Sequence, residues 1–317
     1  MRIVGTGRAH PAKIVPNSEF EKFLDTNDEW IRERTGITER RVISSEQLEE
    51  LAAEASVKAI EDAGLTAKDI DYIICSNVVN EYITPSLSCL IQGAIGASCA
   101  AVDVNAACSG FIYALDMADD RIKSGKAKNV LVVAAEEPTR MVDWSDRSMC
   151  VLFGDGAGAV VVAEGDGEYH SRLTTTCKVD CLHYVRRLEP TPHITKDEPS
   201  GPMYMNGKEV FKTAVLSSSR DIKQLLDESG LKPSDIKYYV LHQANLRIVE
   251  AIANWLKLDM SHFPCNVNYC GNTSSASVPL LLDELARSGK LKRGDKILMS
   301  AFGAGFTTGA CIVEWVK

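Results

Sequence analysis

The 317-residue sequence has no long apolar run. No stretch approaches the ~18 residues that suggest a membrane span. The first residues, MRIVGTGRAHPAKIVPN, contain no apolar core of signal-peptide length. We therefore expect a cytoplasmic protein that acts away from the membrane. The net charge of -8 argues against a nucleic-acid surface, so we expect no nucleic-acid partner.

The ten cysteines include no CxxC pair, so we expect no metal site. In a reducing compartment the cysteines should stay free, and a free cysteine is usually a small buried hydrophobe. Cys108 has an unusual context, because it follows small and β-favouring residues and precedes Phe111, Leu115, Ala118 and Ile122, which are one or two helical turns apart. This spacing predicts an amphipathic helix that begins next to Cys108.

An internal repeat organises the chain. IEDAGLTAKDIDYIICSN (60–77) matches LDESGLKPSDIKYYVLHQ (226–243), and each copy predicts a helix end, a glycine cap, a turn and a buried strand. GAVVVAE, from residue 158, has a counterpart in GACIVEW, from residue 309. We therefore predict an α/β fold of two similar halves, 1–165 and 166–317, with mostly parallel central strands and a pseudo-twofold between them. Four prolines in residues 181–202 predict a loop near this boundary.

The repeat also aligns two loops that carry polar side chains. Cys108 aligns with Asn272, and both precede predicted helices. A helix N-terminus carries about half a positive charge, which is expected to lower the pKa of a thiol. His242 follows the predicted strand Tyr238–Leu241, at the sheet edge where open α/β sheets place ligands. These three residues form a candidate nucleophilic site with hydrogen-bond donors around it.

Structural alternatives exist for each of these residues. Cys108 could be a buried thiol, His242 could be a hydrogen-bonded residue at a strand end, and Asn272 could cap the following helix. The glycine-rich FGDGAGAV lacks GxGxxG or P-loop spacing and precedes a strand, so phosphate binding is not expected there.

Five motifs, NAACSG, FGDGAGAV, HQANLR, GNTSSAS and AFGAGFTTG, together resemble the thiolase-like condensing enzymes. DTNDEWIRERTGITERR and MNGKEVFK are similar to the β-ketoacyl-acyl-carrier-protein synthase III branch. The resemblance implies a thiolase-like fold layered αβαβα. It also implies that Cys108 takes an acyl group from acyl-CoA, and that decarboxylating malonyl-acyl-carrier protein then attacks it. The products would be 3-oxoacyl-acyl-carrier protein, CoA and CO2, at the start of type II fatty acid synthesis. CoA thioesters are then substrates, and no cofactor is implied.

The resemblance also implies roles for individual residues. His242 and Asn272 would stabilise the malonyl oxyanion, and the backbone N–H groups of Cys108 and Ala304 would bind the acylation intermediate. The family usually has glycine where this chain has Ala304. The residues matching the CoA site of the family are Thr26, Trp30, Arg34, Arg147, Met205, Gly207, Ala244 and Asn245.

The family further implies an acidic carrier protein and a homodimer. The dimer would form through AAVDVNA (100–106), and Phe302 and the partner's counterpart of Thr84 would line the acyl pocket. Acetyl-specific members carry Phe in place of Thr84, so we expect room for longer or branched primers. The family often has two lysines where this chain has Asn254 and Trp255. The candidates for carrier-protein docking are Gln243, Ala244, Asn245, Leu246, Arg247, Lys208, Lys212 and Lys257.

Three other functions remain open at this stage. A ketosynthase or acyltransferase of a secondary-metabolite pathway would share Cys108, His242 and Asn272. A cysteine hydrolase would release free acid instead of condensing. A binding scaffold without catalysis would leave the three residues unused.

Overall fold

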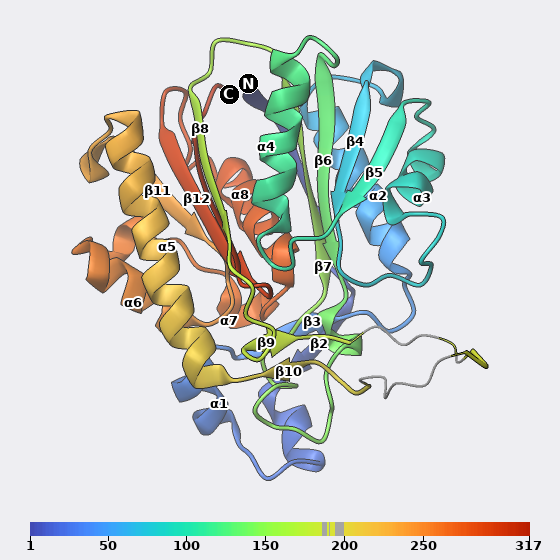
Figure 1. The fold of residues 1–317 in the computed structure, drawn as a ribbon, viewed down its shortest axis with the longest axis vertical. Helices are drawn as coiled ribbons and strands as arrows, with labels where there is room; N and C mark the ends of the chain where they lie inside the picture. Colours follow the sequence, from blue (N-terminus) through green and yellow to red (C-terminus); the bar gives the residue numbers. More distant parts are fainter. Residues whose placement is uncertain (186–188, 190, 194–199) are drawn as a thin grey trace.

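Two β-sheets enclose a pair of central helices in the computed structural model, which describes residues 1–317 except 186–188, 190 and 194–199 (Figure 1). Part of the predicted loop 181–202 therefore lies outside the described residues. The first sheet has the order β1 (Arg2–Ala9), β7 (Gly156–Ala163), β6 (Asn129–Glu136), β4 (Tyr72–Ser76), β5 (Ala100–Val104). The second has the order β8 (Tyr169–Thr175), β13 (Thr307–Glu314), β12 (Lys296–Gly303), β11 (Ile236–Leu241).

The order of the repeated strands is the same in both sheets. β7, β6 and β4 of the first sheet correspond to β13, β12 and β11 of the second. The second sheet contains no counterpart of β5 among the described residues. The predicted strands and the glycine caps are confirmed, since Gly64 and Gly230 follow helices with φ values of 69° and 71°.

The prediction of mostly parallel strands is wrong. β4 runs parallel to β5 and β6, but β7 is antiparallel to both β6 and β1. In the second sheet only β11 and β12 are parallel. The antiparallel pairs involve the last strand of each repeat, β7 or β13. Residues 304–306 between β12 and β13 are too few for a crossover, so β13 must return antiparallel to β12.

The helices form the outer and central layers of the fold. α2 (Leu48–Asp62) and α3 (Leu87–Ile95) cover the first sheet, and α5 (Gly207–Ser229) lies on the second sheet with α6 (Leu246–Leu256) packed against it. α4 (Gly110–Lys123) and α8 (Ser277–Arg287) lie between the two sheets (Figure 1). This arrangement confirms the predicted αβαβα layering.

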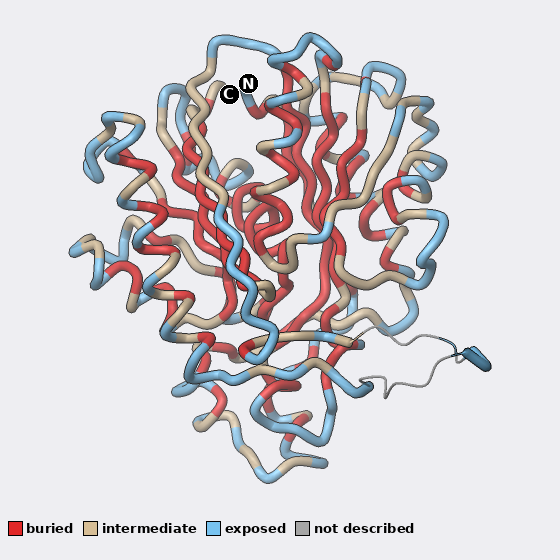
Figure 2. The backbone as a smooth tube through the Cα atoms, in the orientation of Figure 1, coloured by how far each residue is buried: buried red, intermediate tan, exposed pale blue. Residues whose placement is uncertain are grey.

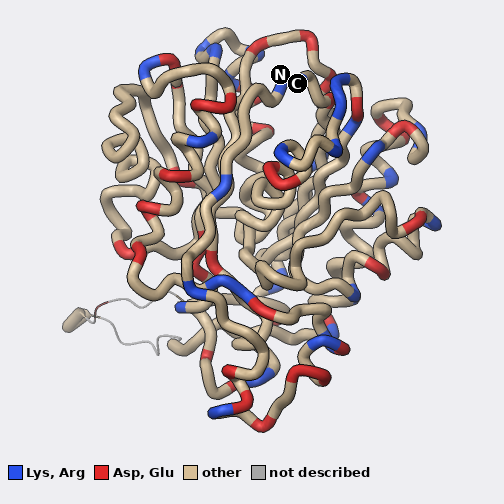
Figure 3. Tube along the Cα trace, turned by 180° about the vertical axis from the view of Figure 1, so that it is seen from behind, with Lys and Arg blue, Asp and Glu red and all other residues tan. Residues whose placement is uncertain are grey.

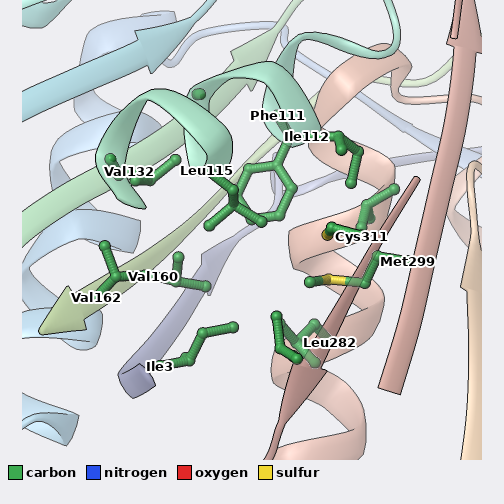
Figure 4. Packing of buried hydrophobic residues seen from close by; sticks show 14 of the residues in the cluster. Ile3, Phe111, Ile112, Leu115, Val132, Val160, Val162, Leu282, Met299 and Cys311 are labelled. Atoms are coloured by element: carbon green, nitrogen blue, oxygen red, sulfur yellow. The ribbon is translucent and has the colours of Figure 1, made fainter. Parts of the chain in front are cut away.

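The central layer contains the main core. Phe111, Leu115 and Ala118 of α4 are fully buried and Ile122 is 7% exposed, which confirms the predicted amphipathic helix. Figure 2 shows the central helices and strands as the buried part of the molecule, whereas the outer helices are buried on one side only. Figure 4 shows Phe111 and Leu115 between strand residues of the first sheet and Leu282 of α8. The interdigitated side chains therefore fix α4 relative to both halves of the chain.

Short elements cover one end of the two sheets. They are β2 (Lys13–Pro16), α1 (Asp28–Thr35), β3 (Glu39–Val42), β9 (Leu182–His183), β10 (Tyr204–Met205) and α7 (Val267–Cys270). β4, β6, β11 and β12 end at this side, and the two chain termini lie at the opposite side (Figure 1). Lys and Arg are interspersed with Asp and Glu along the backbone seen from behind (Figure 3). In the described part of the chain, no helix is both long and apolar enough to cross a membrane.

Candidate active site

Cys108 lies in a tight turn between β5 and α4. The N–H groups of Ser109 and Gly110 bond back to the carbonyls of Ala106 and Ala107, at 3.2 and 3.0 Å, and Ala107 has a left-handed φ of 48°. The turn is pressed against the end of β12, since a Cβ on Gly303 would lie 2.5 Å from the Cys108 nitrogen. Only glycine at position 303 permits this approach.

The predicted low pKa of Cys108 is wrong. Burial raises the pKa of this thiol to about 12, which outweighs a hydrogen bond from Ser274 that lowers it, and nearby Glu136 raises it further. Cys108 does precede the first residue of α4 as predicted, but it is partly buried there, and desolvation outweighs the effect of the helix N-terminus. The resting side chain is therefore a neutral thiol, and its proton must leave when the sulfur reacts.

His242 follows β11 and is 2% exposed. Its Nδ1 lies 2.7 Å from Ser277 Oγ, which accepts the Gln243 N–H at 3.2 Å. The Ser277 hydroxyl proton is therefore free to point at Nδ1, which leaves Nε2 as an N–H donor. Burial lowers the pKa of His242 to about 3, so the ring is neutral near pH 7. Phe302 packs edge-on against this ring, with centroids 5.2 Å apart.

Asn272 is held by backbone bonds on both sides. Its N–H donates to the Leu152 carbonyl at 2.8 Å, and its carbonyl accepts the Gly154 N–H at 3.1 Å. The side-chain Oδ1 accepts the Ser274 N–H at 2.9 Å, which leaves the Nδ2 group as the free donor. His242 and Asn272 thus both offer N–H groups, and both line one cavity with Cys108.

Cys108 lies where two cavities meet. The smaller has a volume of about 350 Å³ and contains Cys108, His242, Asn272 and Phe302. The larger, of about 780 Å³, extends from Cys108 and Ala304 to the loop 77–83. A group bound in either cavity can therefore reach the same sulfur atom.

The residues expected at a CoA site gather around the smaller cavity. Its lining includes Trp30, Arg34, Met205, Gly207, Ala244 and Asn245. Arg147 does not line it, but its guanidinium carbon lies 5.1 Å from the centre of the Trp30 ring, and that of Arg34 lies 5.8 Å away. Thr26 also lies outside the lining, and its buried hydroxyl has no hydrogen-bond partner among the described residues.

Gln243 cannot belong to a docking surface, which corrects the prediction for this residue. It is fully buried, and its side chain donates to the Leu241 carbonyl and accepts the N–H groups of Asn266 and Val267. The sequence alone could not reveal this burial, because Asn266 and Val267 follow Gln243 by 23 and 24 positions. Ala244 is 9% exposed and faces the smaller cavity. The exposed basic candidates are Arg247, Lys208, Lys212 and Lys257, whereas Asn245 and Leu246 are partly buried.

The structure separates the two residues expected in the acyl pocket. Phe302 lines the smaller cavity beside His242. Thr84 is exposed and lines neither cavity of its own chain, although Glu81, Tyr82 and Ile83 line the larger one. Contact of Thr84 with a partner's acyl pocket therefore stays a prediction.

Three polar residues of the site were missed by the sequence analysis. Ser274 Oγ lies 3.3 Å from Cys108 Sγ and 3.3 Å from Glu136 Oε1, and Ser277 contacts His242. The serine-rich motif GNTSSAS (271–277), which contains Asn272, was a usable signal for both serines. Glu136 ends β6 at the same sheet edge, so a strand-end acid could have been considered. The described residues contain no cluster of His, Cys, Asp and Glu that could hold a metal ion.

The neutral state of His242 predicts a pH effect on stability. The unfolded chain takes up a proton at this residue below pH ~6.5, whereas the native ring resists protonation down to about 3. The contribution of His242 to the free energy of unfolding is therefore present above pH ~6.5. This contribution falls by up to about 1.4 kcal/mol for each pH unit below pH ~6.5.

Urea unfolding of the parent and His242→Gln proteins measures this effect. The free energy of unfolding of the parent, relative to that of His242→Gln, should fall as the pH falls from about 6.5 to about 5. A pH-independent difference for His242→Gln would mean that the native ring is protonated as readily as the unfolded one.

Comparison with known proteins places the whole chain in one family. The family model described as 3-oxoacyl-[acyl-carrier-protein (ACP)] synthase III matches residues 102–180, and the model of its C-terminal part matches residues 226–315. The β-ketoacyl-[acyl-carrier-protein] synthase III of Xanthomonas campestris is 45% identical, covering 99% of this chain and 98% of the relative.

Solved structures agree with this match and confirm the predicted thiolase-like fold. The 3-oxoacyl-[acyl-carrier-protein] synthase III of Aquifex aeolicus has a TM-score of 0.92 and 42% identity, with 99% of both chains covered. The priming β-ketosynthase of the R1128 polyketide biosynthetic pathway also has a TM-score of 0.92, at 36% identity, covering 100% of this chain and 96% of its own. Because the likeness extends over the full length at such identities, this chain belongs to the β-ketoacyl-acyl-carrier-protein synthase III family.

Proposed function

We propose that this protein condenses an acyl-CoA primer with malonyl-acyl-carrier protein, forming 3-oxoacyl-acyl-carrier protein, CoA and CO2. This reaction initiates type II fatty acid synthesis. The observation that carries the proposal is the position of Cys108, at the junction of two cavities and beside two neutral N–H donors. Such an arrangement suits a reaction with two substrates and one covalent intermediate, because both substrates must reach the same nucleophile.

The first half-reaction is acyl transfer to Cys108. The sulfur attacks the thioester carbonyl, and the negative charge that develops on the carbonyl oxygen needs donors. The backbone N–H groups of Cys108 and Ala304 supply them, and Thr307 ties these two loops together. Its Oγ1 lies 2.9 Å from the Ala106 carbonyl oxygen and 3.1 Å from that of Ala304. CoA then leaves by the smaller cavity, past Trp30, while the acyl chain occupies the larger one.

The second half-reaction is decarboxylation and carbon–carbon bond formation. Loss of CO2 from the malonyl thioester places negative charge on the thioester oxygen. His242 Nε2–H and Asn272 Nδ2–H stabilise this enolate, whose carbon attacks the acyl-Cys108 carbonyl. No base is needed to remove a proton from carbon. A neutral His242 is suited to this role, because it donates a hydrogen bond without giving up its proton.

Further properties of the protein belong to the same proposal. It uses no cofactor and acts in the cytoplasm as a homodimer, through the β5 segment 100–106. The acidic carrier protein docks on Lys208, Lys212, Arg247 and Lys257, and Asn245 and Leu246 lie beside this surface. The exposed Trp255 adds an apolar contact where the family often has lysine. Charge complementarity at this surface mainly raises the association rate.

A second candidate is the priming step of a polyketide pathway. The likeness to the priming β-ketosynthase of the R1128 pathway favours it, since that structure superposes as closely as the Aquifex enzyme does. The two functions share the chemistry of Cys108 and differ in the carrier protein and the primer. Comparison of condensation rates with the carrier proteins of the two pathway types distinguishes them.

The function is tested by intact-protein mass spectrometry after incubation with acyl-CoA. The parent protein should gain one acyl group on Cys108, and addition of malonyl-acyl-carrier protein should discharge it as 3-oxoacyl-acyl-carrier protein. Cys108→Ala should remain unmodified. Cys89, which is exposed on α3, provides the control, and Cys89→Ala should acylate normally. Release of free acid without condensation would indicate a hydrolase, and an unmodified parent would indicate a binding scaffold.

The two donors are tested by decarboxylation. His242→Ala and Asn272→Ala should each slow the decarboxylation of malonyl-acyl-carrier protein by a factor on the order of 10²–10³, because each removes one donor from the oxyanion. Acylation of Cys108 should be affected less. The release of CO2 from labelled malonyl-acyl-carrier protein measures the first effect, and the rate of acyl-enzyme formation measures the second. Decarboxylation at the parental rate in either variant would refute the role of that residue.

The primer range is tested at Thr84. Each methylene that finds apolar space contributes about 0.8 kcal/mol to binding, so branched and medium-length primers should compete with acetyl-CoA. In Thr84→Phe a phenyl ring should exclude the longer primers and restore acetyl preference. Values of kcat/KM for a series of acyl-CoA primers measure the shift. Thr84→Val, which has nearly the same volume, should keep the parental profile. Strict acetyl preference in the parent, or an unchanged profile in Thr84→Phe, would contradict the prediction.

A further inference from the structure

Glu136 is a buried carboxyl group that the mechanism above does not use. It ends β6 and is 1% exposed. Its Oε2 accepts the Val78 N–H at 3.1 Å, and its Oε1 lies 2.6 Å from Ser275 Oγ and 3.3 Å from Ser274 Oγ. All three partners are neutral groups. A buried carboxylate with only neutral partners is costly, so its position requires an explanation.

Ser274 connects this carboxyl group to the nucleophile. Its backbone has a left-handed φ of 52°, a conformation that costs energy for any residue with a side chain. The conformation places Ser274 Oγ 3.3 Å from Cys108 Sγ and 3.3 Å from Glu136 Oε1. One hydroxyl proton can be donated to only one of the two groups at a time. The Ser274 hydroxyl therefore has two arrangements. It donates to Glu136 when Cys108 is a thiol, and to Cys108 when Cys108 is a thiolate.

In the first arrangement, the Cys108 S–H donates to Ser274 Oγ, and the Ser274 O–H donates to the Glu136 carboxylate. In the second, the Ser274 O–H donates to a Cys108 thiolate, and Glu136 carries a proton. The two arrangements differ by the shift of two protons along existing contacts. No heavy atom has to move between them.

We propose that Glu136 accepts the Cys108 proton through the Ser274 hydroxyl during acylation. The thiol proton passes to Ser274 Oγ as the Ser274 proton passes to Glu136, and the sulfur forms its bond to the acyl carbon. When the tetrahedral intermediate collapses, the bond between carbon and the CoA sulfur breaks. The proton then returns from Glu136 through Ser274 to the CoA thiolate. Cys108 thiol and acyl-CoA thus become acyl-Cys108 and CoA thiol, and Glu136 is regenerated as a carboxylate. This inference rests on the acyl transfer proposed above.

The charges of the site favour such a relay. Burial raises the pKa of Glu136 to about 7 and that of Cys108 to about 12, so the carboxylate and the thiol are the available partners near neutral pH. The relay moves a single negative charge and creates no new one, which limits the desolvation cost. Among the described residues, Cys75 on β4 is a further titratable group close enough to feel the charge of Glu136, and burial raises its pKa well above its usual value. Cys75 is therefore a neutral thiol and does not compete for the proton.

If Glu136 had only a structural role, its removal would have the opposite effect on the reactivity of Cys108. A fixed carboxylate that only anchors Val78 and the two serines would raise the pKa of the Cys108 thiol by repulsion. Its removal would then make Cys108 more reactive. In the relay its removal makes Cys108 less reactive, so the sign of the effect separates the two roles.

The test compares acylation rates of Glu136→Gln and Ser274→Gly with those of the parent, by rapid quench and mass spectrometry. Glycine suits the left-handed backbone at position 274 and keeps the N–H that orients Asn272. Each variant should acylate at least about 100-fold more slowly. Decarboxylation of malonyl-acyl-carrier protein should stay near the parental rate. The parental acylation rate should rise with pH through about 7 as Glu136 ionises, and Glu136→Gln should lack this step.

Asp155 supplies the matched control. It is also fully buried, burial also raises its pKa to about 7, and it bonds to Thr139 and Ile43 away from Cys108. Asp155→Asn should keep the parental pH profile of acylation. Glu136→Asp, which keeps a carboxyl group, should recover part of the rate lost in Glu136→Gln.

Three results would overturn the relay. Acylation at the parental rate or faster in Glu136→Gln or Ser274→Gly is the first. An equal loss of acylation and decarboxylation in both variants is the second, since it would show general disruption of the site. An unchanged pH step in Glu136→Gln is the third. If Glu136→Gln does not fold, the rise of the acylation rate through about pH 7 decides the question, since it must be present in the parent and lost in Ser274→Gly. A parent protein that never forms acyl-Cys108 would instead refute the proposed function itself.

Discussion

The close approach between the Cys108 turn and the end of β12 is the constraint on which the site depends. Gly303 lets the two backbones meet, because any side chain there would collide with the Cys108 nitrogen. Ser109 Oγ and Thr307 Oγ1, 2.8 Å apart, join the same turn to the start of β13. The turn belongs to the first half of the chain and β12 to the second. The nucleophile is therefore positioned by the packing of both halves, and α4, held between the two sheets, keeps that packing fixed.

Burial of this junction determines the protonation states of the site. Desolvation keeps Cys108 as a thiol and His242 as a neutral imidazole, and it raises the pKa of Glu136 toward neutral pH. A neutral His242 with Nδ1 engaged by Ser277 acts as a hydrogen-bond donor, as an enolate requires. The same burial creates a difficulty, because a thiol is a weak nucleophile. The chain must therefore provide a temporary acceptor for one proton during acylation only, and a carboxyl group whose pKa lies near 7 meets that requirement.

Local and repeated patterns in the sequence predicted much of the fold. Apolar spacing predicted α4, glycine caps predicted the ends of α2 and α5, and the internal repeat brought Asn272 to the position that corresponds to Cys108. Sequence patterns gave the wrong answer for properties that depend on tertiary contacts. The helix N-terminus predicted a low pKa for Cys108, but the depth of burial reverses the direction. Gln243 looked like a surface residue, yet Asn266 and Val267 enclose it. The Ser274–Glu136 contact joins residues 138 positions apart, which no local pattern reveals.

The two repeats differ around the active site, and these differences give the two substrates different places to bind. Corresponding loops precede α4 and α8, but one carries a thiol and the other an amide donor. β5 has no counterpart among the described strands of the second sheet, and the chain that follows it forms the nucleophile turn. The expected CoA residues line the cavity on the α1 and α5 side of Cys108, whereas loop 77–83 lines the other cavity. Because both cavities reach Cys108, the acyl chain and the CoA portion of one thioester can occupy one cavity each. The emptied smaller cavity can then admit the malonyl group, because Cys108, His242 and Asn272 all line it.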